Sequence, residues 1–236
     1  GDAGSDTLDG GAGGDSLAGG AGADTLIGGA GSDTLEGGGG DDVITGGTDA
    51  DSMYGGGGSD TFAIEDSFGD DYIDGGEPGS DLDILDFSAL STGIDLTATN
   101  GESGTATDGV STLTFDEIEG LVLSDFNDTV DGTLNFDNWT VDAGAGDDSI
   151  TLGDGDDTIT AGAGNDTLIG GEGADEYYGG LVDDEIYLAG GDYAEGGDGD
   201  DLFILSDLAG STGDINIVGG EGGETSGDVL HVAGVA

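Results

Sequence analysis

Large apolar residues return at every ninth position over the first part of the chain. From Gly1 to Ala63 they are Leu8, Leu17, Leu26, Leu35, Ile44, Met53 and Phe62. Most lie in a triplet that reads polar or small, apolar, polar or small, as in Thr7-Leu8-Asp9, and such alternation is typical of a short strand that buries one side chain. Glycine-rich stretches separate the triplets, and glycine permits the backbone dihedrals of a tight turn. The pattern predicts short strands joined by tight turns.

The same spacing returns from Ala143 to Tyr187. Its apolar positions are Ile150, Ile159, Leu168, Tyr177 and Ile186. Residues 188–195 form a unit that is one residue short, and residues 196–204 restore the pattern with Phe203. A turn and a short strand repeated at a fixed period wind into a solenoid in which each coil stacks on the previous one. We therefore predict an all-β fold, a parallel β-solenoid with two repeat arrays.

The segments outside the arrays predict the domain organisation. Residues 64–90 and 205–236 each follow an array and resemble one another. Because a solenoid needs its ends covered, we predict that both are capping segments, with extra ion sites as the alternative. Residues 91–131 alternate polar and apolar positions and are predicted to be a connecting β segment. The predicted divisions are residues 1–90, with repeats at 1–63, then 91–131, then 132–236, with repeats at about 143–204.

Charge limits the function classes that this chain can belong to. It has 54 acidic residues, no lysine and no arginine, so its formal net charge is −54, and 42 of the acids are aspartate. A chain without fixed positive charge cannot form Lys/Arg salt bridges and is unsuited to nucleic acids, phosphorylated substrates or anionic membranes. It has no cysteine, and no apolar stretch approaches the ~18 residues of a membrane-spanning helix. We expect no nucleic-acid partner and no membrane insertion.

Aspartates follow the same nine-residue period. They hold the sixth place of each unit, at Asp6, Asp15, Asp24, Asp33, Asp42, Asp51, Asp60, Asp148, Asp157, Asp166, Asp175, Asp184 and Asp201. Stacked coils place equivalent carboxylates above one another, which is repulsive unless a cation lies between them. Hard dications take six to eight oxygen ligands, which carboxylates and glycine carbonyls supply, whereas zinc and copper favour nitrogen or sulfur. The pattern predicts multiple bound Ca²⁺ ions.

The units resemble the GGxGxDxUx nonapeptide of the repeats-in-toxin (RTX) family, also called haemolysin-type calcium-binding repeats. Close matches are Gly28-Gly29-Ala30-Gly31-Ser32-Asp33-Thr34-Leu35 and residues 161–168. The resemblance implies a parallel β-roll with two units per turn and Ca²⁺ between units n and n+2. It also implies that the ligands are the sixth-place aspartates together with carbonyls of the turn.

The second- and fourth-place glycines that the resemblance adds as ligands are Gly11, Gly13, Gly20, Gly22, Gly29, Gly31, Gly38, Gly40, Gly144, Gly146, Gly153, Gly155, Gly162 and Gly164. Asp49 and Val182 replace fourth-place glycines, so we expect irregular sites near residues 49, 182 and 188–195.

Nothing in the sequence marks a catalytic site. The chain lacks nucleophile, zinc-protease and phosphate-binding motifs, and its one imidazole, His231, is expected to be structural or exposed. We predict a calcium-binding module with a structural or adhesive scaffold role and no enzymatic activity. The resemblance implies that it leaves a bacterial cell by type I secretion, folds on Ca²⁺ binding and acts outside the cell or at its surface.

Two alternatives stay open. The chain starts inside a repeat, so we expect a fragment of a longer parent, which could be an exported enzyme or toxin that uses this module for secretion and folding. The other alternative is an adhesin segment that binds a surface glycan or ice. Ice adhesion in related rolls uses threonine at the third place, and here those places are Ala3, Ala12, Ala21, Ala30, Gly39, Thr48 and Gly57. The expected partners are calcium ions and either a surface glycan or other parts of a larger parent protein.

Overall fold

The computed structural model describes residues 1–76, 81–205, 213–220 and 227–232. All regular elements in this part of the chain are β-strands, which confirms the predicted all-β class. None of the described residues forms a helix of the length and apolarity needed to cross a membrane. The chain divides into two compact units, residues Gly1–Ser91 with Glu102–Val122, and residues Thr92–Gly101 with Leu123–Ala236. The predicted divisions after residues 90 and 131 stay predictions.

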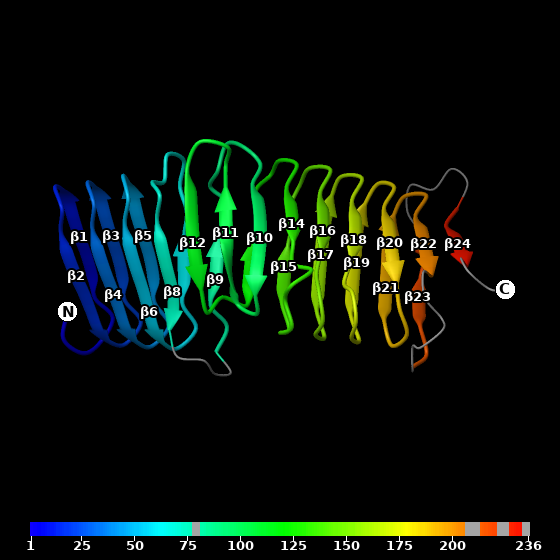
Figure 1. The fold of residues 1–236 in the computed structure, drawn as a ribbon, viewed down its shortest axis with the longest axis horizontal. Coiled ribbons are helices and arrows are strands. Elements are labelled where there is room, and N and C mark those ends of the chain that lie inside the picture. The colour runs from blue at the N-terminus through cyan, green and yellow to red at the C-terminus, as the bar shows by residue number, and fades with distance from the viewer. Residues whose placement is uncertain (77–80, 206–212, 221–226, 233–236) are drawn as a thin grey trace. The chain divides into compact units, whose positions relative to one another are not determined.

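The first unit contains strands of two sheets. In one sheet the order is β1 (Thr7–Ala12), β3 (Thr25–Ala30), β5 (Val43–Thr48), β7 (Thr61–Ala63), β9 (Ile84–Asp86) and β13 (Gly120–Val122). In the other it is β2 (Ser16–Ala21), β4 (Thr34–Gly39), β6 (Ser52–Gly57), β8 (Tyr72–Gly76), β12 (Thr112–Asp116) and β11 (Ser103–Thr107). From β1 to β9 successive strands alternate between the two sheets, as in a solenoid, whereas β11 and β12 lie in the same sheet (Figure 1).

The second unit repeats this arrangement. One sheet has β15 (Thr140–Asp142), β17 (Thr158–Ala163), β19 (Glu176–Leu181), β21 (Tyr193–Asp198) and β23 (Asn216–Val218). The other has β10 (Asp95–Asn100), β14 (Thr129–Asp131), β16 (Ser149–Thr151), β18 (Thr167–Ile169), β20 (Glu185–Leu188), β22 (Leu202–Leu205) and β24 (Val229–Val232). The parallel β-roll predicted from the sequence is therefore confirmed.

The nine-residue period fixes the strand register. Leu8 of β1 pairs with Leu26 of β3, which pairs with Ile44 of β5. Each residue thus lies beside the equivalent residue two nine-residue repeats later, so one coil of the solenoid contains two repeats. Strand pairs within each unit are parallel apart from β11 and β12, which form an antiparallel hairpin around a turn at Asp108 and Gly109, where φ of Gly109 is +86°.

Eighth-place side chains form the core. Leu26, Leu35, Ile44, Met53 and Phe62 are completely buried, as are Ile150, Ile159, Leu168, Tyr177 and Ile186. The residues on either side of them are exposed or half-buried, as the alternation predicts, and include the apolar Ile27 and Val43. The core is narrow because each nine-residue repeat contributes few large apolar side chains to it.

The described parts of the two predicted capping segments lie in the sheets. Residues 64–90 contribute β8, which pairs with β6 and β12, and β9, which pairs with β7 and β13. Residues 205–236 contribute β23, paired with β21, and β24, paired with β22. Residues 77–80, 206–212, 221–226 and 233–236, on which parts of these predictions fall, lie outside the described residues.

Candidate metal centres

Sixth-place aspartates of the first unit stack in two rows. In each row, Oδ1 of one aspartate accepts a hydrogen bond from the backbone N–H of the equivalent aspartate one coil earlier; from Asp6 N to Asp24 Oδ1 the distance is 2.7 Å. The Asp24 row contains Asp6, Asp24, Asp42 and Asp60. The Asp33 row contains Asp15, Asp33 and Asp51. Alternate nine-residue repeats therefore contribute their aspartates to opposite rows.

The second unit contains two equivalent rows. The Asp166 row contains Asp148, Asp166, Asp184 and Asp201, with N to Oδ1 distances of 2.8 to 2.9 Å. The Asp175 row contains Asp157, Asp175 and Asp192, and Asp157 accepts from the backbone N–H of Trp139 at 2.7 Å. Strand register thus brings the thirteen predicted aspartates into stacks, and their role as metal ligands stays a prediction.

The second carboxylate oxygen of most of these residues is buried without a hydrogen-bond donor among the described residues. This holds for Oδ2 of Asp15, Asp24, Asp33, Asp42, Asp51, Asp60, Asp148, Asp157, Asp166 and Asp184. A buried charge without a partner is strongly unfavourable, so each oxygen requires either a proton or a cation. No lysine or arginine is present to supply that positive charge.

First-place glycines leave oxygen-lined gaps beside these carboxylates. A Cβ atom built on Gly19 would lie 2.5 Å from Asp24 Oδ2 and 2.6 Å from the Gly37 carbonyl oxygen of the next coil. Gly28 and Gly179 have the same surroundings, with both oxygens at 2.5 Å. In the units that begin at Ala143, Leu152 and Ala161 a Cβ atom takes this space, so there the unpaired Oδ2 atoms alone support a cation.

Turn glycines hold the backbone in conformations that other residues rarely adopt. Of the glycines predicted as carbonyl ligands, all except Gly153 have positive φ, for example +107° at Gly29. Asp49 and Val182 adopt φ of 75° and 72° at their fourth places, so the turn conformation survives both substitutions. No cluster of three or more His, Cys, Asp or Glu side chains surrounds a metal-sized space within the described ranges. An ion in a row would therefore take most of its ligands from backbone carbonyls.

The oxygen ligands that the rows offer fit calcium. Carboxylate and carbonyl oxygens are the ligands of hard cations, and Ca²⁺ accepts irregular sets of six to eight of them. The described rows contain no imidazole or thiolate that would favour zinc or copper.

Burial changes the acidity of the row carboxylates. It raises the pKa of Asp60, Asp148 and Asp157 to about 7, although each accepts a backbone hydrogen bond that opposes the shift. The pKa of Asp184 rises to about 8, first through burial and then through the nearby charges of Asp166 and Asp201. Without metal, the fold thus favours the protonated carboxyl groups.

We expect calcium affinity to fall on acidification through this range. Because the pKa values of these carboxyl groups are raised from 3.8 to about 7, the metal-free fold gains stability by binding protons as the pH falls from about 7 to about 4. Calcium requires the carboxylate form and must displace these protons, so the apparent affinity of a site falls by up to about tenfold per pH unit below pH 7. Calcium titrations at pH 7.5 and pH 5.5 measure this shift. Equal affinities at both pH values would contradict it.

Sequence reasoning missed residues that extend the rows outside the repeats. Asp83 accepts from the N–H of Asp60 at 2.7 Å, Asp71 from that of Asp51 at 2.9 Å, and Asp128 from that of Ile94 at 2.6 Å. In the next coil Glu119 takes the role of the row aspartate, and its Oε2 accepts a hydrogen bond from the backbone N–H of Asp83 at 2.8 Å. Each of these aspartates precedes a short strand with one inward apolar residue, as in Asp71-Tyr72-Ile73, a signal that the glycine pattern obscured.

Two conspicuous side chains have structural positions. Trp139 is 1% exposed and is therefore a core residue, at the position that corresponds to Asp157 in the next coil. His231 is exposed on β24, as predicted.

Comparison with known families identifies the repeats independently. A sequence profile described as the RTX calcium-binding nonapeptide repeat matches the chain four times, at residues 1–35, 27–62, 140–168 and 151–186. These matches cover the first array and most of the second, and they end before Asp192 and Asp201. No curated protein matches the chain.

Proposed function

Because this chain is an RTX-type calcium-binding repeat protein whose repeats bind multiple Ca²⁺ ions, we propose that it is a secreted module that folds when it meets calcium outside the cell. The observation that carries the proposal is the set of buried carboxylate oxygens without donors. A fold that contains them at neutral pH needs cations from its surroundings.

Linkage supports the proposed switch. An ion that binds the folded state and not the unfolded chain shifts the folding equilibrium in proportion to the logarithm of its concentration. Extracellular calcium modules have dissociation constants of about 10⁻⁴–10⁻³ M, far above cytosolic free calcium. A chain with such sites stays unfolded during synthesis and folds after export, which suits a type I secretion route and a location outside the cell or at its surface.

The folded module acts as a scaffold. The buried aspartates of the described residues belong to the rows or extend them, and we propose a structural or adhesive role without enzymatic activity. The alternative is a noncatalytic module that supports secretion and folding of a larger exported enzyme or toxin. The test of calcium-dependent folding is protease protection as a function of free Ca²⁺. Half-protection at about 10⁻⁴–10⁻³ M supports the proposal, whereas protection at cytosolic calcium levels would contradict it.

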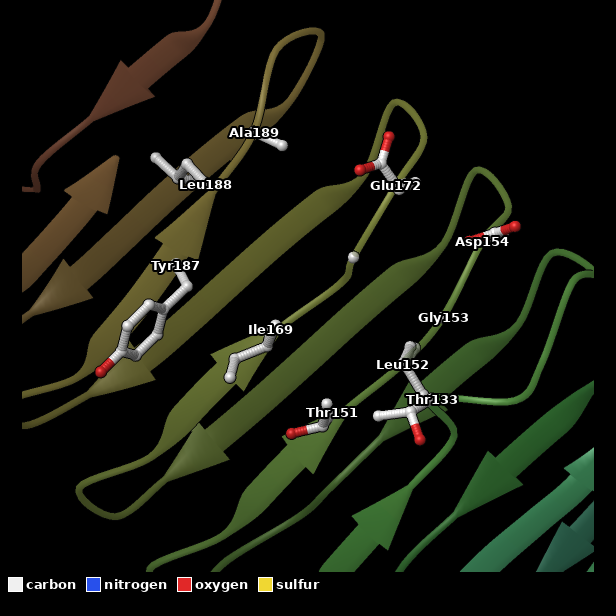
Figure 2. A pocket seen from close by; sticks show the side chains of 11 residues that line it. Thr133, Thr151, Leu152, Gly153, Asp154, Ile169, Glu172, Tyr187, Leu188 and Ala189 are labelled. Carbon is white, nitrogen blue, oxygen red and sulfur yellow. The ribbon is translucent and has the colours of Figure 1, made fainter. Parts of the chain in front are cut away.

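A surface groove in the second unit supports an adhesive role as a second candidate function. The groove has a volume of about 350 Å³ and is lined by residues that include Thr151, Asp154, Ile169, Glu172 and Tyr187. The carboxylates of Asp154 and Glu172 lie on successive turns, and the Tyr187 ring lies on β20 (Figure 2). A groove lined by an aromatic ring and by hydrogen-bond acceptors suits a sugar, and the net charge of −54 favours a neutral one.

We expect Tyr187→Ala to remove glycan binding. Loss of the ring removes the apolar contact surface of the groove and should weaken binding of a neutral glycan by about tenfold or more. A glycan array probed with the calcium-saturated protein measures the change. Tyr193→Ala, on β21 and outside the groove, serves as the control, and equal loss in both variants would contradict a specific site.

A further inference from the structure

The Asp175 row is interrupted at Asp175. Asp175 is completely buried, like the other inner members of the rows, and its Oδ1 accepts from the N–H of Asp157 in the usual way at 2.9 Å. Its Oδ2 differs, because it has a hydrogen-bond donor within the protein. The Oδ2 atoms of Asp157 and Asp166, in the neighbouring repeats, have no hydrogen-bond donor among the described residues.

The donor is the hydroxyl group of Tyr177. Tyr177 holds the eighth place of its unit, which in the full-length array units is otherwise Leu, Ile, Met or Phe, and its side chain is completely buried. Its hydroxyl donates to Asp175 Oδ2 at 3.4 Å and accepts from the backbone N–H of Gly170 at 2.7 Å. A Cβ atom on Gly170 would contact both Asp175 Oδ2 and the Tyr177 hydroxyl oxygen. In the neighbouring unit the equivalent space at Gly179 is bounded by Asp184 Oδ2 and the Gly196 carbonyl oxygen instead.

The coil that follows Asp175 also departs from the repeat. Residues 188–195 are one residue short, and their first place is taken by Leu188, which is 1% exposed, whereas the unit of Asp175 begins with Gly170. Asp192 in this coil accepts from the backbone N–H of Ala189 through Oδ2 at 2.6 Å. Asp128 in the other row is satisfied in a similar way, by the backbone N–H and hydroxyl of Ser124 at 2.9 and 3.1 Å.

We propose that Tyr177 replaces a calcium ion at Asp175, so that the contact between this coil and the next is closed without metal. The hydroxyl satisfies the buried oxygen that a cation satisfies elsewhere, and the short coil that follows begins with Leu188 in place of a first-place glycine. Asp175, although it matches the nonapeptide, is then a hydrogen-bond acceptor and not a calcium ligand through Oδ2. The inference depends on calcium binding by the repeats and not on where the chain folds.

The test is the number of calcium ions bound per chain at saturation, measured by equilibrium dialysis and atomic absorption. Tyr177→Phe removes the hydroxyl, leaves Oδ2 of Asp175 without a donor, and is expected to bind one ion more than the unaltered protein. Tyr178→Phe, which removes an exposed hydroxyl bonded to Glu176 on the same strand, is expected to leave the number unchanged. An unchanged or lower number in Tyr177→Phe would overturn the proposal.

A second pair of variants decides the matter if Tyr177→Phe does not fold. Asp175→Asn retains the Oδ1 acceptor for Asp157 and is expected to leave the number of bound ions unchanged, whereas Asp166→Asn is expected to lower it by at least one. An equal decrease in both variants would show that Asp175 binds calcium and would overturn the proposal. Failure of the proposed extracellular folding would appear instead as an unaltered protein that is folded without calcium, and would leave these differences intact.

Discussion

With a calcium chelator at neutral pH, the chain is expected to lose its β-structure, and millimolar Ca²⁺ is expected to restore it. The net charge of −54 and the stacked carboxylates oppose the metal-free fold, and no basic side chain compensates. The narrow core offsets little of the conformational entropy of ordering, which costs about 1–2 kcal/mol per backbone residue. Each occupied site adds about 1.4 kcal/mol when free calcium is tenfold above its dissociation constant. Several such sites reach the size of a typical folding free energy.

Circular dichroism in chelator, and then on addition of calcium, measures this transition. Sodium chloride at the same ionic strength is the control for general screening of charge, and it is expected to restore little structure because screening supplies no ligand-bound cation. A β-rich spectrum in chelator would refute calcium-dependent folding. Full recovery in sodium chloride would show that charge screening, and not site binding, drives the transition.

Gly29→Ala is expected to destabilise the calcium-saturated protein by about 2–6 kcal/mol. Gly29 has φ of +107°, a conformation that costs about 1–3 kcal/mol for a residue with a side chain. A Cβ atom there would also overlap the Gly11 carbonyl oxygen of the coil before, which adds an overpacking cost of about 1–3 kcal/mol. Because backbone atoms form the obstacle, no rotation of a side chain can relieve it.

Two other glycines separate these contributions. Gly11 has φ of +89° but no atom within 4 Å of a built Cβ, so Gly11→Ala should show the conformational cost alone. Gly57 has neither a positive φ nor a neighbour within 4 Å, so Gly57→Ala should be nearly neutral. Denaturant unfolding at saturating calcium gives the three free energies. Equal losses at Gly29 and Gly11 would contradict the close approach between coils.

The period of the sequence was sufficient to predict the solenoid. A nine-residue spacing of Leu8, Leu17 and Leu26 places every second unit in register, and the observed pairing of Leu8 with Leu26 follows directly. The stacking of the sixth-place aspartates follows from the same register. Calcium as the bound ion followed from oxygen-rich turns without imidazole or thiolate ligands.

Other features were not accessible from the period. Three further aspartates extend the rows by accepting hydrogen bonds from backbone N–H groups, although no complete glycine motif precedes them. They are Asp71, Asp83 and Asp128. The antiparallel β11 depends on a local turn that interrupts the repeat. The hydroxyl of Tyr177 escaped notice because the residue occupies an apolar place, and its hydrogen bond depends on where its ring packs in three dimensions.

The hydrogen bonds of the rows have a direction, and this makes the two ends of each array unequal as templates. Asp6, Asp24 and Asp42 each donate a backbone N–H to a carboxylate of the coil that comes later in the sequence. A coil added on the N-terminal side therefore meets an acceptor already in place, whereas a coil added on the C-terminal side must bring the acceptor with it. Growth of the array toward the N-terminus thus brings the N–H of each new aspartate to a carboxylate already in place, while the N–H of Thr25 in the finished coil receives its acceptor, the Asp6 carbonyl oxygen, in the same step.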